Sequence, residues 1–101
     1  LGSVPIILLG DFNSFSPVDE ADPYLAPVPG NLGNGPISML LNESNPHASQ
    51  VHHWLDVYRE LNPHEKGYSY IDQVYKSRID FIFVNDFFFD KLVNSTVGDT
   101  P

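Results

Sequence analysis

The stretch that decides the fold prediction is Val4–Phe15, with the sequence VPIILLGDFNSF. It begins with an unbroken apolar run bounded by Gly10, and so short and apolar a run predicts a strand buried on both faces. Asp11 and Asn13 follow at once, and residues two apart in an extended chain point to the same side. We therefore expect a carboxylate and an amide to be presented together at the C-terminal end of this strand, where open sheets commonly bind ligands.

The tetrapeptide Gly10–Asn13 also has a plainer interpretation. Gly, Asp and Asn are common turn-forming residues, and every strand has to end. A turn and a functional site are therefore two alternatives for this stretch, and motifs later in the chain favour the site.

Composition limits the class of protein. The chain has 101 residues, enough for one small domain, and no cysteine, which excludes a disulfide framework and a thiolate metal site. The formal net charge is -8, with 13 acidic and 5 basic residues, which argues against charge-driven binding to nucleic acid. An enzyme whose bound cation supplies positive charge is compatible with this balance. No apolar run approaches the roughly 20 residues that a transmembrane helix needs.

Two further features concern the source of the chain. Asn42–Ser44 and Asn94–Thr96 fit the N-glycosylation pattern, which is common by chance and leaves the compartment open while favouring a secreted protein. The chain begins with Leu1 rather than Met, so we expect further sequence before it.

The middle of the chain predicts a long loop and two helices. Ser16–Asn34 is rich in Pro and Gly and predicts a loop with a short turn at Val18–Ala21, in which the acidic side chains are solvated. Gly35–Pro36 offers a helix start. Val51–Leu61 is the clearest helix, with Trp54 on its apolar stripe, and the following Asn62–Pro63 ends it.

The last part of the chain predicts strands. The sequence predicts strands at Tyr68–Ile71 and Arg78–Val84, separated by a polar connection. A final strand is expected around Lys91–Val97. In the second of these, Ile79, Phe81 and Phe83 alternate with Arg78, Asp80, Ile82 and Val84. The aromatic run Phe87–Phe89 predicts core packing or contact with another part of the protein.

Three stretches now stand in order along the chain: Ile7–Asn13, Leu55–Pro63, and Gly67–Tyr70 followed by Ser77–Phe83. Together they resemble the endonuclease/exonuclease/phosphatase superfamily, which includes the DNase I-like nucleases, and the resemblance covers Val4–Val84. It implies an α+β fold that is part of a four-layer α/β/β/α sandwich. Residues 1–101 would be the C-terminal portion of one such domain, incomplete in this chain.

The resemblance also implies roles for individual residues. Asp11 matches the Asp that binds the metal and positions or deprotonates the attacking water, and Asn13 matches the Asn that steadies the phosphate. Asp80 matches the Asp that orients a catalytic histidine. Tyr70 and Arg78 are candidates for substrate contact. A simpler alternative for Asp80 is an ion pair with Arg78, two residues away.

The implied reaction is divalent-metal-dependent hydrolysis of a phosphate ester, in a nucleic acid, a lipid head group or a nucleotide. Oxygen ligands without cysteine fit Mg²⁺ or Mn²⁺ better than Zn²⁺. The four histidines, His47, His52, His53 and His64, are expected to be solvent-exposed, because adjacent helical residues point about 100° apart and cannot easily share an ion.

The family's principal metal-binding Glu and its catalytic His have no counterpart in this sequence. We therefore expect the chain to be inactive by itself. We also expect an exposed apolar sheet face, which the missing N-terminal half of the domain or a partner chain would cover. The alternative function is a non-catalytic binding or structural module that retains the fold.

Overall fold

The computed structural model describes residues 4–41 and 54–98. In chain order the elements are β1 (Ile7–Asp11), the 3₁₀ turn η1 (Pro17–Ala21), α1 (Gly35–Leu41), β2 (Leu55–Asp56), α2 (Val57–Leu61), β3 (Tyr70–Ile71), β4 (Lys76–Ser77), β5 (Asp80–Val84) and the 3₁₀ turn η2 (Asp86–Phe88). Within the described residues these elements form two helices, a three-stranded sheet and a two-stranded sheet, both antiparallel. The predicted α+β class is confirmed.

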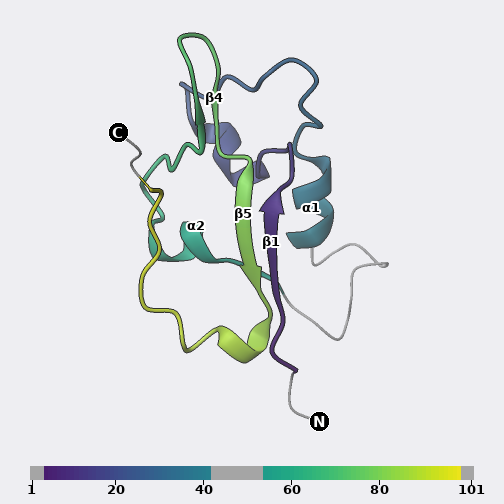
Figure 1. Ribbon diagram of the computed structural model, residues 1–101, viewed down its shortest axis with the longest axis vertical. Coiled ribbons are helices and arrows are strands. Elements are labelled where there is room, and N and C mark those ends of the chain that lie inside the picture. Colours follow the sequence, from purple (N-terminus) through teal and green to yellow (C-terminus); the bar gives the residue numbers. More distant parts are fainter. Residues whose placement is uncertain (1–3, 42–53, 99–101) are drawn as a thin grey trace.

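The three-stranded sheet is built around β5, which has β1 on one side and β2 on the other. Figure 1 shows β1 and β5 side by side through the middle of the molecule. The two strands pair from Ile7 opposite Val84 to Asp11 opposite Asp80. Because every second residue from Ile79 to Phe83 is apolar, the strand conformation of β5 was predictable from the sequence, and the prediction is confirmed from Asp80 onward.

One face of this sheet carries the hydrophobic core. Phe81 and Phe83 stack with ring centroids 5.3 Å apart, and Phe12 packs edge-on against both at 5.7 and 5.5 Å. Ile37 of α1 is fully buried against them, so the helix that Gly35–Pro36 predicted covers this face. The partly buried side chains around this cluster are Phe12, Leu40, Leu41 and Trp54.

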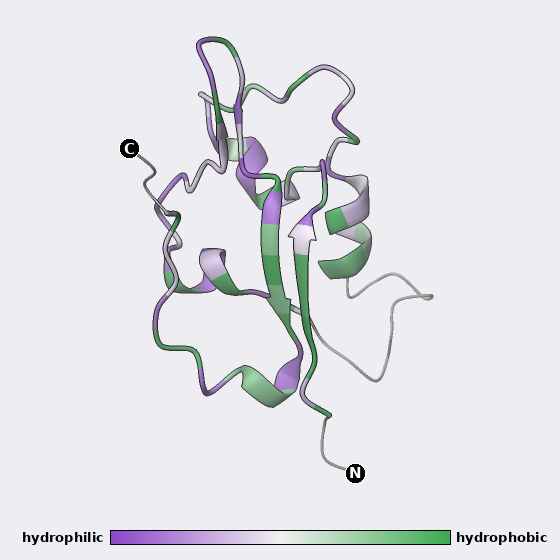
Figure 2. Ribbon diagram, viewed as in Figure 1, coloured by the Kyte–Doolittle hydropathy of each residue, from purple (hydrophilic) through white to green (hydrophobic). Residues whose placement is uncertain are grey.

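The opposite face of the sheet exposes apolar side chains. Ile7, Leu9 and Ile82 are 53, 65 and 46% exposed, and the register places Leu9 directly opposite Ile82. Figure 2 shows the hydrophobic colour along both β1 and β5. The prediction that the first strand is buried on both faces is wrong, because all of β1 is exposed and it pairs only with β5 among the described residues. The expectation of an exposed apolar sheet face is confirmed.

The helix predicted over Val51–Leu61 is much shorter in the structure. Leu55 and Asp56 pair with β5 as β2, and the helix occupies only Val57–Leu61; 51–53 lie outside the described residues. The helix begins where it does because the Asp56 side chain accepts a hydrogen bond from the Arg59 amide at 3.3 Å and caps it. Trp54 therefore precedes the strand and packs against the core instead of lying on a helical stripe.

The polar connection and the last strand also differ from the prediction. β4 forms inside the predicted polar connection and pairs with β3. The strand predicted around Lys91–Val97 is absent from the described residues, and 92–98 follow η2 without regular structure. Phe87 and Phe89 are 37 and 41% exposed, so this aromatic run is not core within the described chain.

The predicted turn at Val18–Ala21 is confirmed as η1, but its first acidic residue, Asp19, is buried rather than solvated. None of the helices in the described chain has the length and apolar character that crossing a membrane requires.

Candidate active site

Asp11 and Asp80 face each other across the sheet. Asp11 is the last residue of β1 and Asp80 the first of β5, and the antiparallel register makes them direct partners. Directly opposed residues share one face, with Cβ atoms roughly 4.5–5.5 Å apart, and two like charges in that arrangement destabilise the sheet. Both residues are exposed. We call them the carboxylate pair, and a bound cation would relieve their repulsion.

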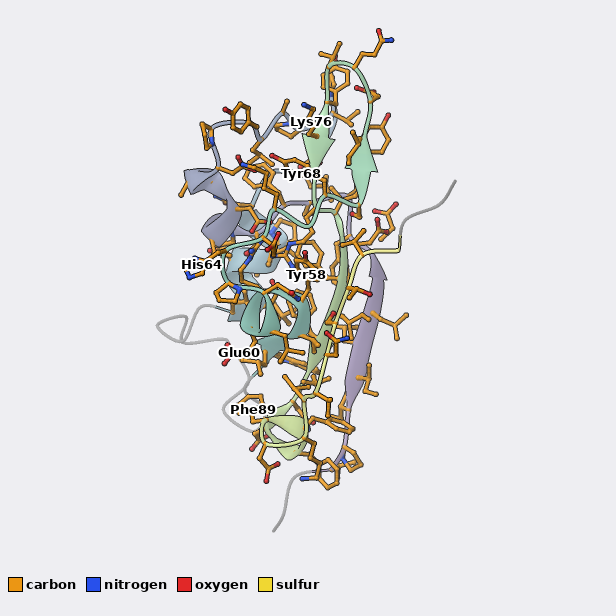
Figure 3. The ribbon with its side chains drawn as sticks, turned by 90° about the vertical axis from the view of Figure 1, so that its left-hand side faces the viewer. Tyr58, Glu60, His64, Tyr68, Lys76 and Phe89 are labelled. Atoms are coloured by element: carbon orange, nitrogen blue, oxygen red, sulfur yellow. The ribbon has the colours of Figure 1, made fainter. Side chains whose placement is uncertain are left out.

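The carboxylate pair lies at a cavity of about 350 Å³. Leu9 and Ile82 continue the same face of the sheet, and 95–97, which precede the C-terminal end, form another wall. Tyr58 of α2 also lines the cavity, and Figure 3 shows it beside β5. The remaining lining residues are Gly10, Gly67, Ser69, Arg78 and Phe81. The cavity therefore combines apolar walls with two carboxylates that form no ion pair within 4–41 and 54–98.

The chain turns sharply just after Asp11. The backbone N–H of Asn13 donates to the Asp11 side chain at 2.8 Å, and Asn13 has a left-handed φ of 45°. Asn tolerates this conformation better than most residues. The hydrogen bond from the Asn13 N–H to the Asp11 side chain, two residues earlier, is typical of an Asx turn. The two side chains are thus not arranged as in an extended chain, and the cavity lining includes Asp11 but not Asn13. The turn interpretation of Gly10–Asn13 and the strand-end carboxylate are both present in the structure.

The start of β5 is held by Ser69, which the sequence analysis did not select. The Ser69 hydroxyl oxygen accepts hydrogen bonds from the Ile79 amide at 3.0 Å and the Asp80 amide at 3.1 Å. The Ser69 amide in turn donates to the Ser77 carbonyl at 3.1 Å. Its position in the Gly67–Tyr70 stretch, close in sequence to the strand of Asp80, was the only signal that could have pointed to it.

Tyr70 lies on β3, outside the cavity lining. Its hydroxyl donates to Asp72 at 3.3 Å, and the negative charge of Asp72 raises the pKa of Tyr70. Asp72 itself accepts from the amides of Tyr75 and Val74, and these bonds lower its pKa. Tyr70 is thus part of the small β3–β4 hairpin, and its predicted substrate contact remains a prediction.

Arg78 lines the cavity but is 2% exposed, and its guanidinium is committed to two carboxylates. It forms two hydrogen bonds to Asp56 at 2.8 and 2.7 Å and two to Asp19 at 3.1 and 3.2 Å. Burial acts to lower the pKa of Arg78, but these carboxylates outweigh it and raise that pKa. The alternative in which Asp80 pairs with Arg78 is therefore wrong, and the substrate contact predicted for Arg78 stays a prediction.

Arg59 joins the same cluster. Its guanidinium donates to Asp19 at 3.1 Å and to the Asn62 carbonyl at 2.9 Å. Asp19, Asp56, Arg59 and Arg78 thus form what we call the buried ion-pair network, which ties η1, β2, α2 and the residues before β5 together. Two positive and two negative charges balance within it.

A second ion pair lies nearby, at a half-buried position. The Lys66 ammonium donates to Asp22 at 2.8 Å, and the Tyr68 hydroxyl also donates to Asp22. Burial acts to raise the pKa of Asp22, but the hydrogen bonds from Lys66 and Tyr68 outweigh it and lower that pKa to about 2. Burial and the charge of Asp22 raise the pKa of Tyr68.

The donor atoms at the carboxylate pair fit part of a magnesium site. Mg²⁺ is often held by one or two protein carboxylates, with waters and substrate phosphates completing its shell. No group of three His, Cys, Asp or Glu residues placed for metal binding occurs within 4–41 and 54–98. His64 is exposed and points outward in Figure 3, as predicted, and the other three histidines lie outside the described residues. Asp11 and Asp80 are thus the residues that would hold an ion at this cavity.

We compared the chain with protein-family models, with curated proteins and with solved structures, and none of them matches it.

Proposed function

We propose that the chain is part of a divalent-metal-dependent phosphoesterase of the endonuclease/exonuclease/phosphatase superfamily. One observation carries the proposal. The two motif carboxylates, far apart in the sequence, are direct partners across β1 and β5 and line one cavity. A chance GDFN turn and a chance strand aspartate have no reason to meet in this way.

The chemistry of the cavity agrees with such a role. Hydrolysis of a phosphate ester requires a positioned water and stabilisation of the charge on the phosphoryl oxygens. Asp11, held by the Asn13 amide, is placed to orient the water and to hold the metal. Asp80 would share that ion with Asp11, and the role of orienting a catalytic histidine, which the resemblance implies for Asp80, stays a prediction. When bound, Mg²⁺ or Mn²⁺ would supply the positive charge that this acidic cavity lacks.

The exposed sheet face agrees with the four-layer architecture. Ile7, Leu9 and Ile82 form an apolar surface beside the carboxylate pair, on the face opposite the core. Contiguous exposed apolar surface commonly marks an interface. We propose that a second sheet, formed by another part of the parent protein, packs on this face and completes the sandwich.

The test is an assay of the full-length protein with Mg²⁺ or Mn²⁺. The probes are bis(p-nitrophenyl) phosphate, p-nitrophenyl phosphate and double-stranded DNA. We expect metal-dependent turnover of at least one probe, and Asp11→Asn should lower kcat by about 10³-fold or more because it removes one member of a cooperating set.

Asp90→Asn is the matched control, since the Asp90 side chain is 84% exposed and, in the part of the chain that the structure describes, pairs only with its neighbour Lys91. It should leave turnover unchanged. Probe binding without any turnover would favour the non-catalytic module, and Asp11→Asn activity within tenfold of the wild type would contradict the role of Asp11.

A further inference from the structure

The hydroxyl oxygen of Ser69 accepts two hydrogen bonds from the main chain. A serine hydroxyl carries one donor hydrogen and two acceptor lone pairs. The oxygen of Ser69 already accepts from the amides of Ile79 and Asp80, at 3.0 and 3.1 Å. Both accepting positions are therefore filled by the main chain, and the hydroxyl can interact with a further group only by donating its hydrogen.

This hydrogen is available on the cavity side. Ser69 is exposed and lines the cavity together with Asp11 and Asp80. No oxygen of 4–41 or 54–98 accepts from the Ser69 hydroxyl. The two amides that donate to the oxygen also polarise the O–H bond, which strengthens it as a donor.

An acidic cavity needs such a donor if it is to accept a phosphate. The carboxylate pair repels an anion, and the guanidinium of Arg78 is balanced by Asp19 and Asp56. A neutral hydroxyl can donate to a phosphoryl oxygen, whereas a positively charged donor would pair with the carboxylates instead of with the phosphate. Tyr70, the neighbouring candidate, donates to Asp72 and does not line the cavity.

We infer that Ser69 is a catalytic residue whose hydroxyl donates a hydrogen bond to a non-bridging phosphoryl oxygen of the substrate. This inference rests on the proposed function and names the residue that receives the phosphate in that same site. The bond strengthens as charge builds on the oxygen in the transition state, so its effect is expected mainly in kcat.

The experiment uses the full-length protein, Mg²⁺ and p-nitrophenyl phenyl phosphate, with its two phosphorothioate enantiomers as further probes. Sulfur is a poor hydrogen-bond acceptor, so placing it at the oxygen that Ser69 contacts removes the same interaction as Ser69→Ala. We expect Ser69→Ala to lower kcat by about 10²-fold on the oxygen probe. For one enantiomer, the ratio of oxygen to sulfur rates should fall about tenfold in this variant.

Two further variants separate this role from a structural one. Ser69→Thr keeps the hydroxyl and should restore most of the rate and the wild-type sulfur ratio. Ser38→Ala is the control, because Ser38 lies on α1 and does not line the cavity. It should change neither the rate nor the sulfur ratio. A purely structural Ser69, or one that donates only to the Asp80 carboxylate, would slow all three probes equally and leave the sulfur ratios unchanged, which overturns the inference.

The failure of the proposed function gives a different result. Wild-type protein without metal-dependent turnover of any probe overturns both proposals, whereas turnover with unchanged ratios in Ser69→Ala overturns only the assignment of Ser69.

Discussion

Two groups of charged side chains lie near the start of β5, and they differ in charge balance and in burial. The buried ion-pair network balances two aspartates with two arginines, and its members Asp19, Asp56 and Arg78 are 7, 7 and 2% exposed. The carboxylate pair is exposed, and neither of its members forms an ion pair among the described residues. Balanced charges here hold elements together, whereas unbalanced charges are left at a cavity.

The two charged residues of one sequence motif, Arg78 and Asp80, belong to different groups. Arg78 and Asp80 belong to the same short run, yet the first faces inward to the network and the second faces the cavity. Alternation does not separate them, because residues two apart in a strand share a face. Arg78 precedes β5 and its guanidinium reaches Asp19 and Asp56, whereas Asp80 is the first residue of the strand and is exposed. Arg78 thus joins the residues before β5 to η1 and β2, and Asp80 follows two residues later at the cavity.

The largest effect is expected from breaking the network at Arg78. Arg78→Ala removes both bidentate pairs and leaves buried carboxylates without compensation, so it should lower the free energy of unfolding by about 3–5 kcal/mol. Arg78→Lys keeps the charge but not the planar fork, and we expect an intermediate loss. Urea unfolding followed by circular dichroism measures both.

Lys91→Ala is the control for that experiment. Lys91 pairs with Asp90 at a surface position where both side chains are at least half exposed, so its removal should cost only about 0–1 kcal/mol. An Arg78→Ala loss no larger than this would show that the network contributes little to stability.

The sequence predicted the strand and strand end of the carboxylate pair better than it predicted the buried ion-pair network. The alternation in Arg78–Val84 was sufficient to predict β5, and the strand-end position of Asp11 was sufficient to select it. The burial of Asp19 was not predictable, because its partner Arg78 is 59 positions away and the surrounding loop is polar and rich in Pro. Local composition favours a solvated loop, and only tertiary pairing overrides it.

Other missed features have the same cause. Leu55 and Asp56 fit the apolar and polar faces of a helix by periodicity, but pairing with Phe83 and Val84 and the Asp56 cap make them a short strand and a helix start. Ser69 was missed because its importance comes from two amides ten and eleven residues later in the chain. In each case a contact made by distant or non-helical residues outweighs the local signal.

An intermediate effect is expected at the half-buried pair of Asp22 and Lys66. The folded protein lowers the pKa of Asp22 from 3.8 to about 2, so its stabilising contribution is present above pH 3.8 and is lost as the pH falls through about 2. After allowance for solvent screening, this contribution is roughly 1–2 kcal/mol. Unfolding free energies measured between pH 5 and pH 2 should decline less steeply in Asp22→Asn than in the wild type; identical slopes would contradict the assignment.

The smallest effect, and the sharpest test of the comparison, is expected at the carboxylate pair. Asp11→Asn keeps the Oδ1 atom that accepts from the Asn13 amide, so the turn should persist while one of the two opposed charges is removed. The variant should be as stable as the wild type or more stable by about 0.2–1 kcal/mol, because like charges directly opposite destabilise a sheet. Asp80→Asn should act in the same direction.

The double variant decides whether the two residues act as a pair. Once one charge is gone the repulsion is gone, so adding Asp80→Asn to Asp11→Asn should give little further gain, and the two effects should not add. Urea unfolding of the wild type, both single variants and the double variant, at low ionic strength, measures this coupling. Mg²⁺ should stabilise the wild type and not the double variant, because only the wild type offers both carboxylates. Additive effects would mean that the two carboxylates do not repel each other. Equal stabilisation of all four proteins by Mg²⁺ would mean that they do not share an ion.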